Sequence, residues 1–342
     1  MYITHVNSLC TKTTTLIDSI PYPQYIHQVS DGGMRVSLGA KILPSEFVEY
    51  MLRGSQGATT ASRESIGTTT AVGGRNGLIL ATGGSVWTGY GTTTPLTDNY
   101  PKHKILPLGM TQIYAGQLAN RIGKFQYVST DSTACISAHA ALYQARNLIA
   151  SDVLDRVVVV STDNGASEEY MHFFGENGLC ALQDDTSNTK FRLGQGANIT
   201  ILESEESIEV TGNKPLAKLH DISIVSEQHS NPLGIASTGE GYRRVLTNVL
   251  TPDMLSKVNY VKTHSTFSED NNIEHKVITE MLGDVRQENY KKKIGHTMGS
   301  STAVEMHLAM RNYRGTFISL GAGMGNVFSA AVVETLSAFR EE

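Results

Sequence analysis

The chain has 342 residues, 40% of them hydrophobic, which is enough for two core-bearing halves because a single core stops growing at about 250–300 residues. Its formal net charge is −5, and no block of Lys and Arg is long enough to contact a phosphate backbone, so nucleic acid is excluded as an expected partner. No apolar run reaches the roughly 18 residues of a membrane span and the first residues do not resemble a secretion signal, so no membrane association is expected.

Runs of β-branched residues alternate with segments of helical period, which is the pattern of an α/β fold. Residues 76–82 and 156–162 are continuously apolar at their centres, which predicts central strands covered on both faces. Apolar residues recur at helical spacing over 135–150, which predicts a helix with one broad buried face. A second apolar helix is predicted over 302–310, and it leads into a strand at 316–320.

Two short polar, turn-rich segments, residues 204–207 and 211–215, form the expected boundary within the chain. We therefore divide the chain into an N-terminal half, 1–210, and a C-terminal half, 211–342. In outline each half contains a helix that leads into a strand, although the halves share no convincing sequence identity.

Cys135 lies where a β-rich stretch ends, small residues form a turn and the helix over 135–150 begins. Unpaired backbone N–H groups and the helix dipole stabilise a thiolate there, so we expect a lowered pKa and a nucleophile. A buried structural cysteine fits the position about equally well. With Cys10 and Cys180, the chain has three cysteines, too few for a disulfide framework, which indicates a reducing compartment and a cytoplasmic protein.

Two histidines far downstream favour the catalytic interpretation of Cys135. His264 directly follows the strand-like residues 258–262, and His296 follows Lys291 by five residues in the run Lys-Lys-Lys-Ile-Gly-His-Thr-Met-Gly. Each of these histidines lies where an ordered element meets a loop. The other nine histidines are expected to be ordinary core or surface residues.

Taken together, these segments resemble the β-ketoacyl synthases, the condensing enzymes of the thiolase superfamily, in the elongating branch that uses a Cys-His-His triad. Five segments carry the resemblance in the right order: residues 107–135, 191–197, 259–266, 291–299 and 319–326. The resemblance implies a thiolase-like α/β fold, in which two similar α/β halves form a five-layered αβαβα architecture.

The resemblance also implies an activity and a set of catalytic residues. Cys135 would accept an acyl chain, which is then extended by decarboxylative Claisen condensation with malonyl-acyl carrier protein in fatty-acid or polyketide biosynthesis. His264 and His296 would stabilise the enolate, because hydrogen-bond donors in a dry site stabilise developing negative charge. Lys291 would support the electrostatics and hydrogen bonding of the two histidines.

Further residues carry over with supporting roles. The backbone N–H groups of Cys135 and Ala322 would form the oxyanion hole. Thr266 and Ser268 would line the phosphopantetheine arm, although both also fit ordinary turn residues. Two supporting carboxylates are implied, Glu274 and Glu305, of which Glu274 lies one residue closer to His264 than is usual.

Four positions depart from the family pattern, and the chain is also shorter than most relatives. Gln195 stands where the glycine-rich strand of the family usually has Glu. Ser265 replaces the usual glycine of the first histidine motif, and Met324 replaces a glycine of the closing loop. Ala322 stands where the elongating enzymes have a phenylalanine gate, so gating of the acyl pocket must differ.

The resemblance implies no bound cofactor and no metal, and no metal-ligand spacing is visible in the sequence. Acyl carrier protein is the expected partner, with its phosphopantetheine arm as the substrate carrier. A homodimer is expected from the fold, and a heterodimer with a related ketosynthase-like subunit fits equally well.

Two alternatives to a condensing enzyme stay open. A non-condensing acyltransferase of the thiolase fold could keep the same triad, and the chain could be a ketosynthase-like subunit of a heterodimer. A non-catalytic chain-length-factor subunit would lose the nucleophile, whereas Cys135 is present. A thiolase proper would need a second cysteine near the closing loop, and residues 319–326 contain none.

Overall fold

The computed structural model describes residues 1–11, 25–28, 36–37, 74–83, 111–164, 168–181, 190–266 and 270–336. Five strands belong to the first half: β1 (Tyr2–Thr11), β4 (Asn76–Ala81), β5 (Tyr127–Asp131), β6 (Arg156–Asn164) and β7 (Gln195–Glu203). Two short strands, β2 (Tyr25–Gln28) and β3 (Val36–Ser37), extend from β1. Both central strands predicted from the sequence are therefore present, as β4 and β6.

The second half repeats this set with five further strands. These are β8 (Ala217–Ser226), β9 (Val258–Lys262), β10 (Arg286–Glu288), β11 (Gly315–Gly323) and β12 (Val327–Thr335). The strand predicted over 316–320 is the centre of β11. Its additional residues at the C-terminal end reach the glycine-rich loop.

The two sets of strands have the same order and the same directions. The whole path runs β10-β9-β11-β12-β8-β1-β7-β6-β4-β5. In each set three parallel strands (β5-β4-β6 or β10-β9-β11) are followed by two antiparallel strands (β7-β1 or β12-β8). A short antiparallel pairing, Tyr2 with Lys218 and Ile3 with Ala217, joins the sets. This repeated topology confirms the expected two similar α/β halves.

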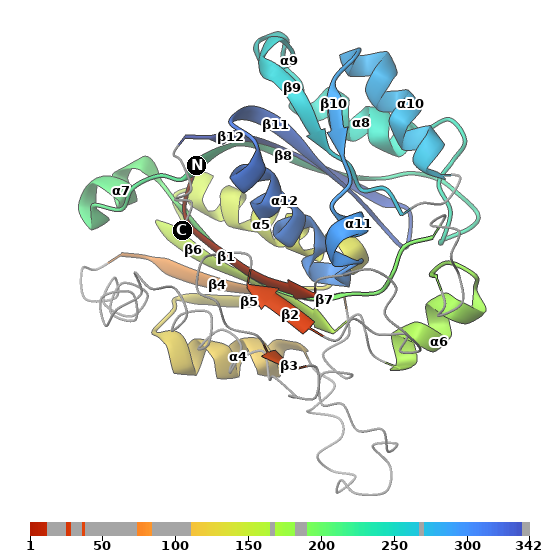
Figure 1. Cartoon of the computed structure of the whole chain (residues 1–342). Coiled ribbons are helices and arrows are strands. Elements are labelled where there is room, and N and C mark those ends of the chain that lie inside the picture. Colours follow the sequence, from red (N-terminus) through yellow and green to blue (C-terminus); the bar gives the residue numbers. More distant parts are fainter. Residues whose placement is uncertain are drawn as a thin grey trace, which may run out of the picture.

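Helices complete five layers (Figure 1). Two central helices, α5 (Ser137–Ala150) and α12 (Ser301–Asn312), contact each other and strands of both halves. On one outer face α4 (Thr111–Ile122) packs on β4 and β5, and on the other α8 (Glu240–Val249) packs on β8 and β12 beside α10 (Asp270–Leu282). The αβαβα architecture predicted from the resemblance is therefore confirmed.

Small apolar residues allow the two central helices to approach each other. Ala138 and Ala141 of α5 and Ala303 of α12 are fully buried in one cluster with residues from both sheets. Alanine favours a helix and brings little bulk, so the middle layer can be filled by two helices at close range. The sequence predicted both helices, and a 3₁₀ turn precedes each of them: η2 (Ala134–Ile136) and η3 (Met298–Ser300).

The predicted boundary between the halves contains a short helix, α7 (Glu205–Thr211). Ser204 caps it, since its Oγ accepts a hydrogen bond of 3.0 Å from the N–H of Ser207. Two glutamates occupy the first turn, and Gly212 ends the helix with a φ of 69°. The segment expected to divide the halves therefore contains a capped helix, α7, between its polar and turn-rich residues.

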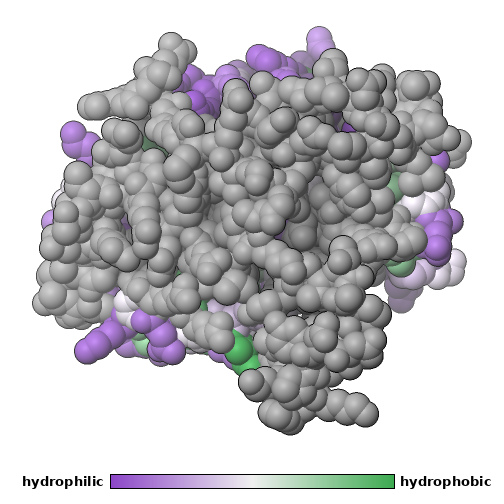
Figure 2. All heavy atoms as spheres, turned by 60° about the horizontal axis from the view of Figure 1, so that its bottom comes forward, coloured by the Kyte–Doolittle hydropathy of each residue, from purple (hydrophilic) through white to green (hydrophobic). Residues whose placement is uncertain are grey.

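Three further short helices complete the described part of the chain. They are α6 (Glu168–Glu176), α9 (Pro252–Lys257) and α11 (Lys291–Ile294). Described side chains at the rim of the face in Figure 2 are mostly hydrophilic. Within the described ranges, every helix is too short or too polar to cross a lipid bilayer.

Candidate active site

Four side chains predicted to be catalytic come from the two central helix starts and the loops beside them. Cys135 lies in η2 and Lys291 begins α11. His264 lies two residues after the end of β9, and His296 lies between α11 and η3. All four are buried, with exposed fractions between 1% and 6%. Because η2 and η3 contact each other, residues from both halves meet at this point.

The turn that presents Cys135 has an unusual backbone. Ala134 has a φ of 46°, in the left-handed region that residues other than glycine rarely adopt. Ser137 stabilises the turn, because its Oγ accepts from the N–H of Thr133 at 2.9 Å and lies 2.7 Å from the carbonyl oxygen of Ala134. Strained backbone of this kind persists only where the surroundings hold it, and it occurs frequently at functional sites.

The thiol of Cys135 is not ionised at rest, contrary to the prediction from its place at a helix start. Burial raises the pKa of this thiol to about 12. The positive charge of Lys291 and a hydrogen bond from the backbone of Met324 lower that pKa, whereas the carboxylates of Asp163 and Glu305 raise it. The helix-start argument failed because it omitted the desolvation of the thiolate, which is the largest contribution here.

The start of α12 repeats the backbone of the Cys135 turn with glycine in place of the cysteine. Met298 has a φ of 50°, like Ala134, and Gly299 follows it. A Cβ at Gly299 would lie 2.1 Å from the backbone nitrogen of Gly83, so no side chain fits. The buried carboxylate of Asp163 joins the same atoms, since its Oδ2 accepts from Gly299 N at 2.6 Å and from Gly83 N at 2.7 Å.

Three partners hold the loop that carries His264. Glu274 accepts hydrogen bonds from the backbone N–H groups of His264 at 2.6 Å and of Ser265 at 2.8 Å. Lys291 Nζ donates to the carbonyl oxygen of His264 at 2.6 Å, and Asn289 donates to that of Ser265 at 3.2 Å. Ser265 has a φ of 26°, which accounts for glycine being usual at this position in the resembling family.

His296 is held by the glycine-rich segment that precedes and begins β7. Its N–H donates to the carbonyl oxygen of Arg192 at 2.6 Å, and its carbonyl oxygen accepts from Gly194 at 2.9 Å. A Cβ at Gly196 would lie 2.7 Å from Cβ of Thr297, so the close approach of this segment requires glycine. The ring of Phe191 packs edge-on against the imidazole, with centroids 5.1 Å apart.

The two imidazoles lie side by side. Their ring centroids are 5.7 Å apart and their planes meet at 81°. Nδ1 of His296 lies 3.3 Å from the backbone N–H of Met298, which donates to it, so the neutral ring carries its proton on Nε2. Nδ1 of His264 is buried and has no hydrogen-bond partner among the described residues.

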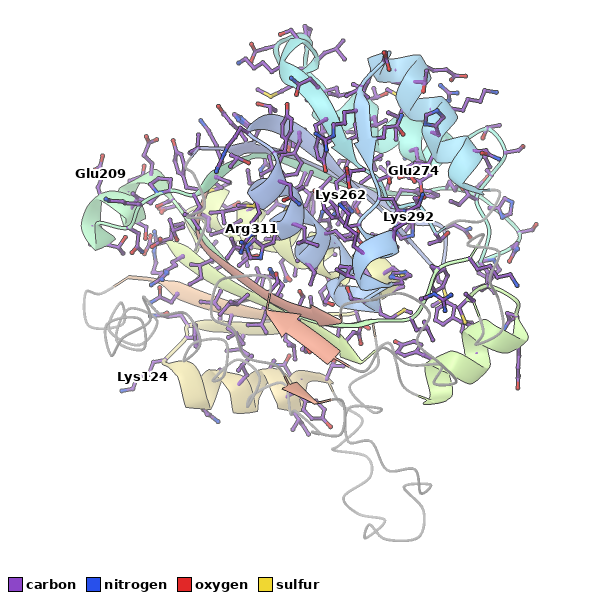
Figure 3. The ribbon with its side chains drawn as sticks, viewed as in Figure 1. Lys124, Glu209, Lys262, Glu274, Lys292 and Arg311 are labelled. Atoms are coloured by element: carbon purple, nitrogen blue, oxygen red, sulfur yellow. The ribbon has the colours of Figure 1, made fainter. Side chains whose placement is uncertain are left out.

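A buried charge cluster lies behind the histidines. Glu305 of α12 accepts from Lys291 Nζ at 2.7 Å, from Lys262 Nζ at 3.0 Å and from Ser301 Oγ at 2.5 Å. Glu274 lies in the same region as Lys262, beside α11 and α12 (Figure 3). Burial would raise the pKa of Glu305, but the two ammonium groups outweigh it and lower that pKa to about 2.

Both imidazoles are neutral at physiological pH. Burial, followed by the positive charge of Lys291, lowers the pKa of His296 to about 3 and that of His264 well below its usual value. Neutral imidazoles in a buried site can donate an N–H hydrogen bond to an oxygen on which negative charge develops. The pair of imidazoles therefore suits the stabilisation of an oxyanion or enolate.

The other residues predicted for the site are the two supporting carboxylates, the residues expected along the phosphopantetheine arm, and Ala322. Glu274 and Glu305 hold the histidine loop and the lysines, respectively, and Thr266 is half-buried at the end of that loop. Ala322 is buried in β11 opposite Phe328, two residues before the Met324 backbone that contacts the thiol. Ser268 lies outside the described residues.

Sequence reasoning missed two buried charged residues at this site. Lys262 ends β9, and a lysine two residues before a histidine gave no signal of full burial. Asp163 directly follows the apolar run 156–162 in β6, and an acidic residue at the end of a buried parallel strand is a recognisable candidate. Neither residue received a role from the sequence alone.

The fold and this centre define a thiolase-fold protein with cysteine and paired histidines at the starts of its central helices. No family model matches the chain, and no curated protein matches it in sequence. Among solved structures, the chain is similar to one chain of AntDE:AntF, a type II PKS acyl-carrier protein in complex with its ketosynthase bound to the hexaketide. That match has a TM-score of 0.74 and 16% identity, and it covers 98% of this chain and 99% of the other.

Two individual ketosynthases are also similar. The ketosynthase from module 6 of the bacillaene synthase of Bacillus subtilis 168 matches with a TM-score of 0.61, 14% identity and coverage of 77% of this chain and 55% of the other. FabY from P. aeruginosa, also a ketosynthase, matches with a TM-score of 0.63, 14% identity and coverage of 76% and 52%. The matches to these two span about half of their lengths. The chain thus has the fold of the ketosynthases, as the motifs predicted.

Proposed function

We propose that this chain is a β-ketoacyl synthase, which takes an acyl chain onto Cys135 and extends it by decarboxylative condensation with malonyl-acyl carrier protein. The proposal is supported by the ketosynthase fold and by the placement of a buried thiol and two neutral imidazoles around Lys291. The observation that carries it is the pair of imidazoles, 5.7 Å apart, whose surroundings keep them uncharged.

In the first half-reaction Cys135 would attack an acyl thioester. A thiol with a pKa of about 12 is protonated at rest, so its proton must leave as the carbon–sulfur bond forms. The departing phosphopantetheine sulfur can take up that proton, which gives acyl-Cys135 and a free carrier thiol. The backbone N–H groups of Cys135 and Ala322 are the proposed donors to the oxyanion.

In the second half-reaction the malonyl thioester would lose CO₂, and its electrons would move into an enolate. His264 and His296 are the proposed donors to the enolate oxygen, with Nε2 as the donating atom of His296. The enolate carbon then attacks acyl-Cys135, the carbon–sulfur bond breaks, and the cysteine sulfur recovers a proton. The product is a β-ketoacyl thioester extended by two carbons.

The proposal extends to the partner proteins, the oligomeric state, the cellular location and the two halves of the chain. Acyl carrier protein would deliver both thioesters through its phosphopantetheine arm, with Thr266 and Ser268 along the arm. A homodimer or a heterodimer with a related subunit is proposed. A cytoplasmic location is also proposed, and the free thiols of Cys135 and Cys180 are consistent with it. We propose residues 1–210 and 211–342 as the two structural halves.

The test is reconstitution with malonyl-acyl carrier protein and an acyl-carrier-protein thioester, with CO₂ release and the β-keto product measured separately. Replacement of the thiol in Cys135→Ala is expected to abolish acyl loading and condensation while CO₂ release continues. His296→Ala is expected to lower CO₂ release about 10²–10³-fold, because one donor to the developing charge is lost. His275→Gln, an exposed histidine on α10, serves as the matched control and should retain wild-type rates.

Other outcomes distinguish the alternatives. Stable acylation of Cys135 without CO₂ release would indicate a non-condensing acyltransferase. Activity that depends on adding a second ketosynthase-like chain would indicate one subunit of a heterodimer. Absence of both acylation and CO₂ release with every carrier protein would contradict the proposed function.

A further inference from the structure

Lys262 is a fully buried lysine that the proposed mechanism does not yet use. Its side chain has no exposed surface, and its Nζ donates to Glu305 Oε2 at 3.0 Å. It also donates to the carbonyl oxygen of Leu320 in β11. Lys262 ends β9, where it pairs with Ser319 of β11. One ammonium group therefore connects β9, β11 and the central helix α12.

Glu305 has two lysine partners, and one would be enough to neutralise it. Lys291 Nζ lies 2.7 Å from the other carboxylate oxygen and also has no exposed surface. The nearby carboxyl group of Glu274 is committed to two backbone N–H groups, and burial raises its pKa. Burying an ammonium group is costly unless a carboxylate balances it, so stability alone gives no reason for the second lysine.

The charge of Lys262 acts on the paired imidazoles. Together with Lys291, it is among the causes that lower the pKa values of His264 and His296. On α5, His139 is also fully buried and its pKa is lowered, first by burial and then by Lys262. Glu305 from α12 and Glu274 from α10 complete the set of charged or titratable groups that surround this ammonium group among the described residues.

The second contact of Lys262 reaches the strand that approaches the thiol. Leu320 lies in β11, two residues before Ala322 and four before Met324, whose backbone contacts Cys135. Through this carbonyl the ammonium group holds the end of β11 in position relative to α12. A single side chain thus connects the histidine side of the site to its thiol side.

We propose that Lys262 is a positioning residue of the condensing site, which joins Glu305 to the main chain of β11 and places a second positive charge behind both histidines. This inference rests on the proposed function. Its charge favours the enolate, because negative charge develops on an oxygen in front of the imidazoles only when CO₂ leaves. Acyl transfer to Cys135 uses backbone donors instead and is less dependent on Lys262.

The test compares Lys262→Met with the wild type and with Lys276→Met, which removes a lysine with 72% of its side chain exposed on α10. Lys262→Met is expected to lower the rate of CO₂ release from malonyl-acyl carrier protein about 10- to 100-fold, a range typical of residues that support the reacting groups. Acyl loading of Cys135 should change less than threefold. Lys262→Arg, which keeps the charge, should retain more of the CO₂ release than Lys262→Met does.

The urea concentration at the midpoint of unfolding tests the inference without a measurement of activity. Because Lys291 still neutralises Glu305, Lys262→Met should unfold at the same urea concentration as the wild type or at a higher one. Equal CO₂ release in Lys262→Met and an active wild type would overturn the inference and leave the proposed function intact. A large fall in the unfolding midpoint, or failure to fold, would also overturn it, because Lys262 would then serve folding. If the wild type is inactive, the proposed function fails, and the inference that rests on it fails as well.

Discussion

Glu305→Gln tests the buried charge cluster most directly. This substitution keeps the size of the side chain but removes the carboxylate that contacts both Lys262 and Lys291. Two ammonium groups without exposed surface then face a neutral amide. The expected result is a marked loss of stability, in contrast to the tolerance expected of Lys262→Met.

The size of the effect follows from the pKa of Glu305. The two lysines lower it from 4.5 to about 2, and each pKa unit corresponds to about 1.4 kcal/mol, so the ionised carboxylate contributes about 3 kcal/mol. A carboxyl group whose pKa is lower in the folded state stabilises that state above its unfolded pKa. The contribution is therefore complete above about pH 5 and is lost as the pH falls from 4.5 towards 2.

Urea unfolding followed by circular dichroism measures this contribution. At pH 7 the free energy of unfolding of Glu305→Gln should be about 3 kcal/mol below that of the wild type, and the difference should shrink when both are measured near pH 3. Glu280→Gln, on the surface of α10, is the matched control and should change stability by less than about 1 kcal/mol. A loss below 1 kcal/mol at pH 7, or an equal loss at both pH values, would refute the reasoning.

Three other predictions concern the loops around the site. Ser265→Gly should raise the free energy of unfolding by about 0.5–1 kcal/mol in urea titrations, because residue 265 has a positive φ. A lower free energy of unfolding in this variant would show that the serine side chain is needed. Alkylation of Cys135 by iodoacetamide, followed by peptide mass spectrometry, should accelerate about tenfold per pH unit up to pH 10, and a plateau near pH 8 would contradict a thiol pKa of about 12. Ser137→Ala should lower the free energy of unfolding by about 1–2 kcal/mol and slow the acylation of Cys135, because the strained turn at Ala134 loses its side-chain hydrogen bonds. Unchanged acylation kinetics would argue against a role of Ser137 in presenting the nucleophile.

Local patterns were sufficient to predict the elements that carry the site. The helical spacing after Cys135 and the continuous apolar run over 156–162 depend only on neighbouring residues, and both predicted elements are present. The five-layer arrangement came from the family resemblance and not from composition. Its confirmation depends on the strand order, which no short segment of sequence specifies.

Long-range electrostatics could not be predicted in the same way. The thiol pKa of Cys135 was predicted in the wrong direction, because desolvation depends on how completely distant strands cover the helix start. Lys262 occupies a strand end where lysine is usually exposed, and only the approach of Glu305, 43 residues later, makes it a buried partner. The catalytic roles assigned to His264 and His296 stay predictions until the kinetic tests are done.

The glycine at the start of α12 has a consequence for protein engineering. The two halves repeat the same turn, and a Cβ at Gly299 would lie 2.1 Å from the backbone nitrogen of Gly83 in the other half. The repeat therefore cannot be made symmetrical by installing a second sulfur in Gly299→Cys. Such a change would push the two halves apart at the position where Asp163 joins them, and a duplicated fold is thereby restricted to a single nucleophile.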